Sequence, residues 1–218
     1  LKYGIKKTLD DIEGMYSFCI YDYNKNVIFF ARDRFGEKPL YFFDNKNYFI
    51  LNSENYIFEK KDFSKIDQNS IIKYLFYGYF PNDSSIFKDQ FKLLPGHYGT
   101  YDLKNHKINI EKYWHIPTKS NYKFSIEDIA ETLHSSINKS LVSDKKIGFF
   151  LSGGIDSSLI CSIASKSQRI NTFSMNFEEE SYNEEKYSDY LSKEINSNHI
   201  AFKTNLKNTR DHIINIDK

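Results

Sequence analysis

The first half of the chain alternates short apolar segments with turn-forming residues. The segments MYSFCIYDY, NVIFFARDR, PLYFFD and NYFILNSE alternate or run apolar, and Asn, Asp, Gly and Lys separate them. One helix is expected near DQNSIIKYLFYGYF, and a further hairpin is expected about residues 102–106. The pattern over residues 3–114 therefore predicts a β-rich region.

The second half has a helical rhythm that alternates with short strands. Ser125 and Asp128 are placed as a capping box, and they open a run of apolar residues at helical spacing: Ile126, Ile129, Ala130, Leu133, Ile137 and Leu141. The sequence then predicts a strand over IGFFL, a helix from about Asp156, a strand over INTFSMNF, a helix over NEEKYSDYLSKEI and a short strand over HIAF. Such alternation is typical of a parallel sheet with covering helices.

The two rhythms meet at the segment HIPTKSNYKF, which is polar, contains Pro117 and has no periodicity. We place a domain boundary there, which gives one domain over residues 1–116 and another over residues 117–218. The predicted fold class is therefore α+β followed by α/β.

Composition and charge exclude some classes of function but do not identify one. The 218 residues are 40% hydrophobic, and Lys+Arg 30 against Asp+Glu 29 gives a formal net charge of +1. Because the charge forms no long basic face, nothing predicts nucleic-acid binding, and the many aromatic residues are expected in cores and interfaces. No apolar run approaches the roughly 20 residues of a membrane-spanning helix. The start, LKYGIKK, lacks the apolar region of a secretory signal, so a cytoplasmic location is expected.

Three smaller features receive structural interpretations. Cys19 and Cys161 form no CxxC or disulfide-rich pattern, and we expect both to be core thiols. The charged triplet over residues 32–34 is expected to form ion pairs within a loop. His97 is expected to be a turn residue.

The clearest candidate for chemistry is the sequence IGFFLSGGIDSSLI, in which a buried strand feeds a helix through Ser152-Gly153-Gly154-Ile155-Asp156-Ser157-Ser158. Ligands of open parallel sheets sit at the carboxyl ends of strands, and a helix N-terminus attracts anions. Glycine allows close approach to the backbone, hydroxyls donate to phosphate oxygens, and Asp156 could cap the helix or face a magnesium ion. The alternative is a tight turn with a serine or aspartate cap and no ligand. The string is neither a Walker A loop nor GxGxxG.

This string resembles the SGGxDS pyrophosphate-binding loop of the ATP pyrophosphatases. The resemblance implies an enzyme that adenylates a carbonyl oxygen of its substrate and releases pyrophosphate, after which a nucleophile displaces AMP. In that chemistry, the loop would hold the two-phosphate leaving group and stabilise its growing charge.

A longer resemblance covers nearly the whole chain. In order and spacing, EGMYSFCIYD, ARDRFGEKPLYFF, LNSE, YGYFPNDSSIFKDQFKLLPGHY and EKYW are similar to the later part of the glutaminase domain of glutamine-hydrolysing asparagine synthetases. The segments FFLSGGIDSSLICSIASK, TFSMNF and SYNEEKYSDYLSKEINSNH resemble the start of their synthetase domain. The fold implied is a partial Ntn-hydrolase glutaminase with antiparallel sheets, joined to a partial parallel-sheet ATP-pyrophosphatase domain like the adenine nucleotide alpha hydrolases.

The resemblance also implies a reaction and a site. The substrates would be glutamine, aspartate and ATP with Mg²⁺, and the products asparagine, glutamate, AMP and pyrophosphate. Asp156 would face the metal, while Leu151 and Met175 would flank the adenine and ribose, although both would be buried strand residues without any ligand. The expected ATP and pyrophosphate site consists of Leu151, Ser152, Gly153, Gly154, Asp156, Ser157, Ser158 and Met175. The resemblance is compatible with a homodimer and does not require one.

Departures from the family pattern concern both ends. The family's nucleophile is a cysteine at the mature N-terminus, whereas Cys19 follows MYSF inside a strand and does not correspond to it. The second synthetase signature, a Ser-Gly-containing loop followed by Asp-Glu, is not reached before Lys218. We therefore expect part of a longer protein, with no glutaminase activity in this chain alone. Asn196 stands where a helix-ending glycine is usual, and His199 matches a family histidine that is expected to be structural.

Two alternatives stay open from the sequence. An amidotransferase of the same build could act on another carboxylate, for instance in surface-polysaccharide assembly. The chain could also be a degenerate nucleotide-binding module without turnover.

Overall fold

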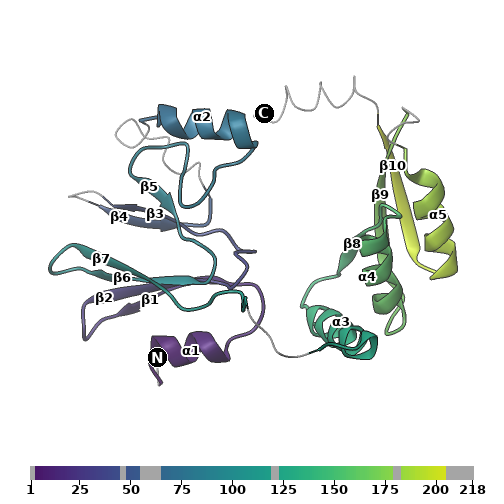
Figure 1. Cartoon of the computed structure of the whole chain (residues 1–218), viewed down its shortest axis with the longest axis horizontal. Coiled ribbons are helices and arrows are strands. Elements are labelled where there is room, and N and C mark those ends of the chain that lie inside the picture. The colour runs from purple at the N-terminus through teal and green to yellow at the C-terminus, as the bar shows by residue number, and fades with distance from the viewer. Residues whose placement is uncertain (1–2, 45–47, 55–64, 119–122, 179–182, 205–218) are drawn as a thin grey trace. The chain divides into compact units, whose positions relative to one another are not determined.

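The computed structural model describes residues 3–44, 48–54, 65–118, 123–178 and 183–204, and its contacts divide the chain into two compact units, Leu1–Ser120 and Asn121–Lys218 (Figure 1). Part of the segment HIPTKSNYKF lies outside the described residues. Within the described part of the chain, no helix is both long and apolar enough to cross a membrane.

The first unit contains two antiparallel sheets. The larger sheet has the strand order β1-β2-β6-β7, with β1 Ser17–Asp22, β2 Val27–Arg32, β6 His97–Asp102 and β7 Lys107–Lys112. The smaller sheet has the order β4-β3-β5, with β3 Tyr41–Asp44, β4 Phe49–Asn52 and β5 Gln90–Lys92. The expected hairpin is confirmed, because β6 and β7 pair from Asp102 and Lys107 outward.

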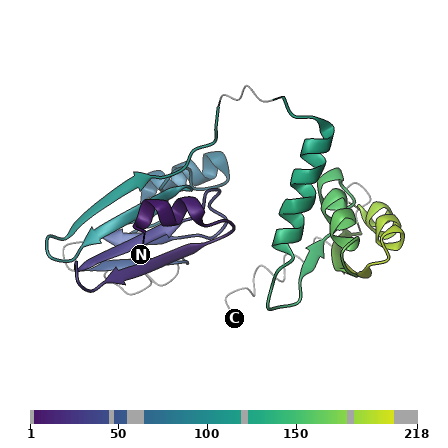
Figure 2. The same ribbon diagram turned by 90° about the horizontal axis from the view of Figure 1, so that it is seen from below.

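Side chains of both sheets meet in one core. Phe30 of β2, Phe42 of β3 and Tyr101 of β6 are buried there together, and the ring of Phe49 stacks on that of Tyr101. The opposite face of the larger sheet is covered by α1 Ile5–Asp11, whose Leu9 is fully buried. Figures 1 and 2 show α1 on one side of the two sheets and α2 Gln68–Tyr77 on the other.

The structure adds two elements that the pattern did not predict. Only one helix was expected in this region, and α2 confirms it with Asp67 as its N-cap and Gly78 left-handed at its end. The additional helix α1 has seven residues, which are too few to show a helical period in the sequence. Leu9 is its buried residue. The strand β5 has three residues and is similarly short.

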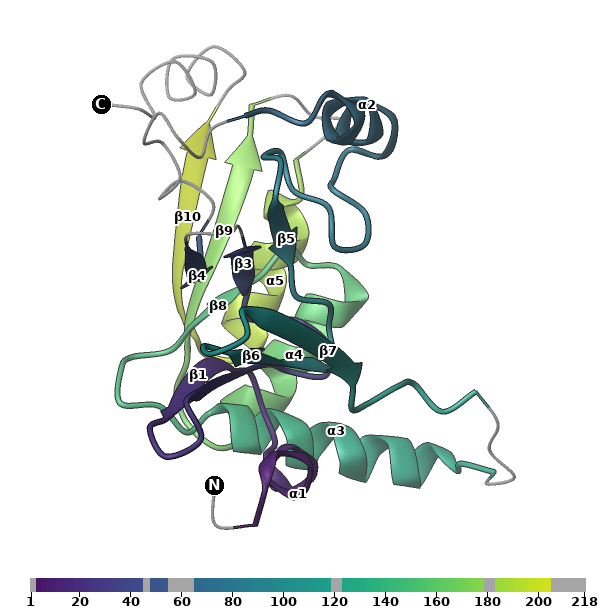
Figure 3. The same cartoon turned by 90° about the vertical axis from the view of Figure 1, so that its left-hand side faces the viewer.

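The second unit is a parallel sheet with helices on one face. Its elements are α3 Ile126–Ser140, β8 Gly148–Phe150, α4 Ile155–Ser165, β9 Asn171–Phe177, α5 Glu185–Glu194 and β10 Asn198–Thr204. The strand order is β10-β9-β8, and Figure 3 shows β9 and β10 running in the same direction. The capping box is confirmed, since Ser125 and Asp128 exchange side-chain and backbone hydrogen bonds. The strand β10 has seven residues and is longer than the predicted HIAF segment.

The two faces of this sheet differ. The core contains Leu151, Cys161, Ala164 and Ile170, and residues from α3 and α5 pack against it; α3 lies alongside α4 (Figure 2). On the other face, Phe150, Met175, Ile200 and Phe202 are exposed. Asn196 has φ 51, so the expected left-handed residue after α5 is confirmed.

The expectation for the two cysteines was half right, and the expectation for His97 is confirmed. Cys161 is buried, which raises the pKa of its thiol, whereas Cys19 is exposed because β1 is an edge strand of its sheet. His97 closes a turn, because its N–H donates to the carbonyl oxygen of Leu94 at 3.2 Å, and it is also the first residue of β6. Its Nδ1 lies 2.8 Å from the carbonyl oxygen of Pro95.

Within the described residues, the charged triplet makes hydrogen bonds to backbone groups and forms none of the expected ion pairs. Arg32 and Asp33 are both buried at the end of β2, in a turn over residues 32–38 that we call the Arg32 loop. The Arg32 guanidinium donates to the carbonyl groups of Gly36, Lys38 and Leu93. The Asp33 carboxylate accepts from the backbone N–H groups of Phe35, Glu37 and Lys38. These bonds fix the loop, so its role is structural.

Candidate functional site

The sequence SGGIDSS forms the turn after β8 and the first turn of α4, and we call its residues 152–158 the Ser152 loop. The loop follows Leu151, whose N–H still donates to the carbonyl of Phe173 at 2.8 Å and so continues the sheet. Within the loop, the hydroxyls of Ser152 and Ser157 lie 3.0 Å apart, and the N–H of Gly154 donates to Ser152 Oγ at 3.3 Å. The loop is therefore held at the carboxyl end of β8, the end at which parallel sheets bind ligands.

The N-terminus of α4 has no side-chain cap. Gly154 is the N-cap residue, and Asp156 lies exposed in the first turn without accepting a capping bond. No serine or aspartate side chain therefore caps the N–H groups of the first turn of α4, although Ser152 Oγ accepts the N–H of Gly154 itself. The N–H groups at the start of α4 keep their capacity to bind an acceptor, and the helix dipole favours an anionic one.

The two glycines of the loop have different surroundings. Gly153 has φ +84, and a Cβ there would lie 2.4 Å from the Cβ of Tyr187 and 3.0 Å from the backbone N of Ser188. Only glycine therefore lets α5 lie against the loop. A Cβ on Gly154 would meet nothing closer than Ser152 Oγ at 3.4 Å. The close approach seen at Gly153 is thus to α5.

A cavity of about 230 Å³ adjoins the loop at the carboxyl ends of β8 and β9. Three of the predicted site residues line it: Leu151, which is 1% exposed, Ser152, and Met175, which is 62% exposed. The expectation that Met175 is a buried strand residue is wrong. The other predicted residues, Gly153, Gly154, Asp156, Ser157 and Ser158, form the adjoining loop and the first turn of α4.

Sequence reasoning missed four polar residues of this cavity, namely Ser174 and Asn176 of β9, Glu184 just before α5, and Ser188. A signal was available in β9, where Thr172, Ser174 and Asn176 alternate with apolar residues and are all buried. A strand whose buried face is polar is unusual, so that face could have been examined for a ligand.

Within the Ser152 loop, Asp156 supplies the one carboxylate for a magnesium ion, and Glu184 lies in the lining of the adjoining cavity. Among the described residues, no group of three or more His, Cys, Asp or Glu side chains could hold a metal. Asp156 is exposed beside the uncapped helix end. This arrangement fits Mg²⁺ that arrives with phosphate groups, because such ions use one or two carboxylates and keep several waters.

His199 of β10 lies in the polar layer between the sheet and α5. Its Nδ1 is 2.9 Å from Thr172 Oγ1, its Nε2 is 3.2 Å from Ser174 Oγ, and the same Nε2 is 3.8 Å from a carboxylate oxygen of Asp189. Both ring nitrogens therefore have partners within the fold. These contacts support the expected structural role.

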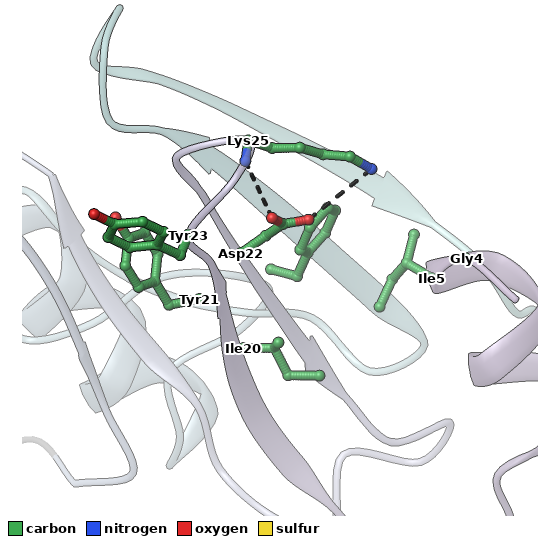
Figure 4. Close-up of a pocket in the computed structure, with 8 residues that line it drawn as sticks. Gly4, Ile5, Ile20, Tyr21, Asp22, Tyr23 and Lys25 are labelled. Carbon is green, nitrogen blue, oxygen red and sulfur yellow. Dashed lines mark hydrogen bonds and ion pairs between the residues drawn. The ribbon is translucent and has the colours of Figure 1, made fainter. Parts of the chain in front are cut away.

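A larger cavity of about 510 Å³ lies in the first unit beside α1 (Figure 4). Its wall includes Ile5, Ile20 and Phe29, and its charged pair is Asp22 with Lys25. Asp22 accepts from the backbone N–H of Lys25 at 3.1 Å and lies 4.0 Å from its ammonium group, so the two charges serve the β1–β2 turn. This cavity offers an apolar surface without an arrangement of reactive groups.

Known protein families match both units. The model of a glutamine amidotransferase domain matches residues 1–114, and the model of an asparagine synthase matches residues 128–217. The chain thus combines an amidotransferase domain with a synthase domain. It belongs to the family of glutamine-hydrolysing asparagine synthetases, as its resemblance had indicated.

Individual relatives support this family membership. A Methanocaldococcus jannaschii protein named as an asparagine synthetase is 35% identical over 178 residues, which cover 77% of this chain and 35% of the relative. Asparagine synthetases 2 and 1 of Bacillus subtilis are 33% and 30% identical over 86% and 79% of this chain. The matches cover 27% and 28% of those two proteins, so the chain spans about a third or less of its relatives' length.

Proposed function

We propose that the protein to which this chain belongs is an ATP-dependent amidotransferase that makes asparagine. Glutamine would supply ammonia, ATP would activate the β-carboxylate of aspartate, and ammonia would then displace AMP. The proposal rests on family membership together with one observation, the uncapped start of α4 beside the cavity. The fold types proposed are an Ntn hydrolase for the first unit and a PP-loop ATP pyrophosphatase for the second.

The Ser152 loop would bind the β- and γ-phosphates of ATP. The N–H groups of the first turn of α4 and the hydroxyls of Ser152 and Ser157 would donate to phosphate oxygens, where charge grows as pyrophosphate leaves. Asp156 would bind the magnesium ion that the phosphates carry. Leu151 and Met175 would contact the nucleoside in the adjoining cavity.

Glutamine hydrolysis would require a nucleophile that neither cysteine of this chain supplies. Cys161 is buried in the second unit, and Cys19 lies inside β1. The family's nucleophile uses its own α-amine as the base, which an internal residue cannot do. We therefore expect the chain alone to release no glutamate from glutamine above a buffer control.

The test of the ATP site is calorimetric titration of the 218-residue chain with MgATP and with pyrophosphate. Ser157→Ala removes a loop hydroxyl and should weaken both ligands by roughly tenfold, because hydrogen bonds to charged groups are worth about 1.5–3 kcal/mol. Ser165→Ala, at the other end of α4, is the matched control and should leave both affinities unchanged. Failure of the unchanged chain to bind either ligand would contradict the proposal.

A further inference from the structure

The larger sheet of the first unit has two edges that differ in character. Among the described residues, β1 pairs with β2 alone and β7 pairs with β6 alone. The edge strand β7, KINIEK, carries Lys107 and Lys112, and lysine on an edge strand discourages pairing with further strands. The edge strand β1, SFCIYD, contains no Lys, Arg or Pro. It therefore lacks the residue types that keep the edge of a sheet unpaired.

Apolar side chains of β1 are exposed on both faces of the strand. Ile20 is 36% exposed on the face toward α1, and Tyr21 is 51% exposed on the opposite face (Figure 4). Cys19 is also exposed and shares the face of Tyr21, because side chains alternate along a strand. A strand that is apolar on both faces is typical of the inside of a sheet rather than of its edge. The pattern of β1 thus indicates another strand beside it.

The backbone of β1 also directs hydrogen-bonding groups toward this edge. The N–H of Asp33 donates to the carbonyl oxygen of Tyr16 at 2.9 Å, so the carbonyl group of Tyr16 faces the β2 side. The direction of these groups alternates from residue to residue in an antiparallel pair. The N–H and C=O groups of Ser17, Cys19 and Tyr21 are therefore directed away from β2, toward the edge of the sheet.

We propose that β1 pairs with β1 of a second copy of this chain, in antiparallel orientation, about a two-fold axis at Cys19. In this register Cys19 lies opposite Cys19 of the second copy, and Ser17 lies opposite Tyr21. Each outward N–H then meets an outward carbonyl group, and the two larger sheets become one continuous sheet. The inference is independent of the proposed ATP site.

Side chains and charges are self-complementary in this register. Phe18 comes opposite Ile20 of the second copy, beside the apolar wall of the 510 Å³ cavity. Glu13, which is exposed shortly before β1, comes near Lys25 of the second copy, whose side chain is 72% exposed. The acidic Asp22 comes opposite an aromatic residue rather than another carboxylate. These matches favour a second copy of this chain over an unrelated extended segment.

The test is the oligomeric state of the 218-residue chain, measured by sedimentation velocity over a range of concentrations. The unchanged chain should form a dimer. Cys19→Lys places two ammonium groups opposite each other at the axis and should weaken the dimer by roughly tenfold or more. Asn109→Lys adds the same charge at an exposed position of the other edge strand, β7, and should leave the dimer unchanged. Because Cys19 is exposed, its lysine variant should stay folded, which circular dichroism checks.

Cross-linking with a short bis-maleimide tests the register without relying on the lysine variant. Cys161 is buried, so Cys19 is the thiol that should react and join two chains. Cys19→Ser should dimerise like the unchanged chain but should not be cross-linked. A monomeric unchanged chain would overturn the proposal. A dimer that persists in Cys19→Lys, or one whose Cys19 thiols are not joined, would overturn it as well, because the copies would then meet through another surface or in another register.

Discussion

The Arg32 loop and the Ser152 loop both follow a β-strand and both concentrate polar residues, yet they use their hydrogen bonds differently. In the Arg32 loop, a buried guanidinium and a buried carboxylate form their hydrogen bonds with backbone groups of the same unit. In the Ser152 loop, the hydroxyls contact each other and the N-terminus of α4 is uncapped. A polar loop that satisfies itself is structural, whereas one with capacity left over can bind a ligand.

The largest loss of stability should follow from removing the Asp33 carboxylate from the Arg32 loop, whose polar side chains are paired with backbone groups. Asp33→Ala leaves three N–H groups without their acceptor, and the expected loss of stability of the first unit is about 3 kcal/mol or more. The single Trp, Trp114, packs edge-on against Phe35 of this loop, so its fluorescence reports the unfolding. Asp102→Ala, at a half-buried turn aspartate that accepts two backbone N–H groups, should cost clearly less. Equal losses in the two variants would contradict the comparison.

A smaller effect should separate the two glycines of the Ser152 loop. Gly153→Ala forces a side chain against α5 at positive φ and should destabilise the second unit by about 2 kcal/mol or more. Gly154→Ala has room and an ordinary φ, so the cost should stay below about 1 kcal/mol. Thermal unfolding followed by circular dichroism measures both. If Gly154→Ala proves the more damaging variant, the packing described for Gly153 is wrong.

Asp156→Asn should change ligand binding more than stability. The substitution keeps the shape but removes the charge, so affinity for MgATP should fall by about tenfold. Metal-free ATP should instead bind more tightly, because a carboxylate no longer repels the phosphates. Titrations with magnesium and with a chelator measure the two affinities. A parallel change in both would show that Asp156 does not face the metal.

Acid should produce the smallest effect, and it should act on the Arg32 loop. Burial tends to raise the pKa of Asp33, but hydrogen bonds from the backbone N–H groups of Lys38, Glu37, Gly36 and Phe35 outweigh it and lower the pKa. A carboxyl group with a lowered pKa stabilises the fold above its unfolded pKa of about 4, and that contribution is lost as the pH falls through the folded value. Denaturation followed by Trp114 fluorescence should show this decline. In Asp33→Asn the decline should be shallower; an identical decline would refute the assignment.

Local patterns predicted most of the fold. The capping box at Ser125 and the alternation of strands and helices after it are encoded within a few neighbouring residues, so the second unit follows from its sequence. Features that depend on distant partners were missed or misread. The exposure of Cys19 follows from the edge position of β1, and the single buried side chain of α1, Leu9, depends on the sheet beneath it.

The candidate site was predictable as a loop but not as a cavity. The residues of the Ser152 loop are contiguous, and their types alone suggest phosphate binding. Glu184 and Ser188 lie near the start of α5 and reach the cavity only through the fold. Contacts between such distant segments are not encoded in a local pattern.

The contact between Gly153 and α5 has a consequence for the thermodynamics of association. Since Tyr187 and Ser188 of α5 occupy the space beside Gly153, the loop is supported on that side and cannot shift toward α5. Its conformation is therefore set before any ligand arrives, and little ordering entropy remains to be lost when one binds. A rigid receptor of this kind favours fast and reversible exchange of a ligand over slow folding around it.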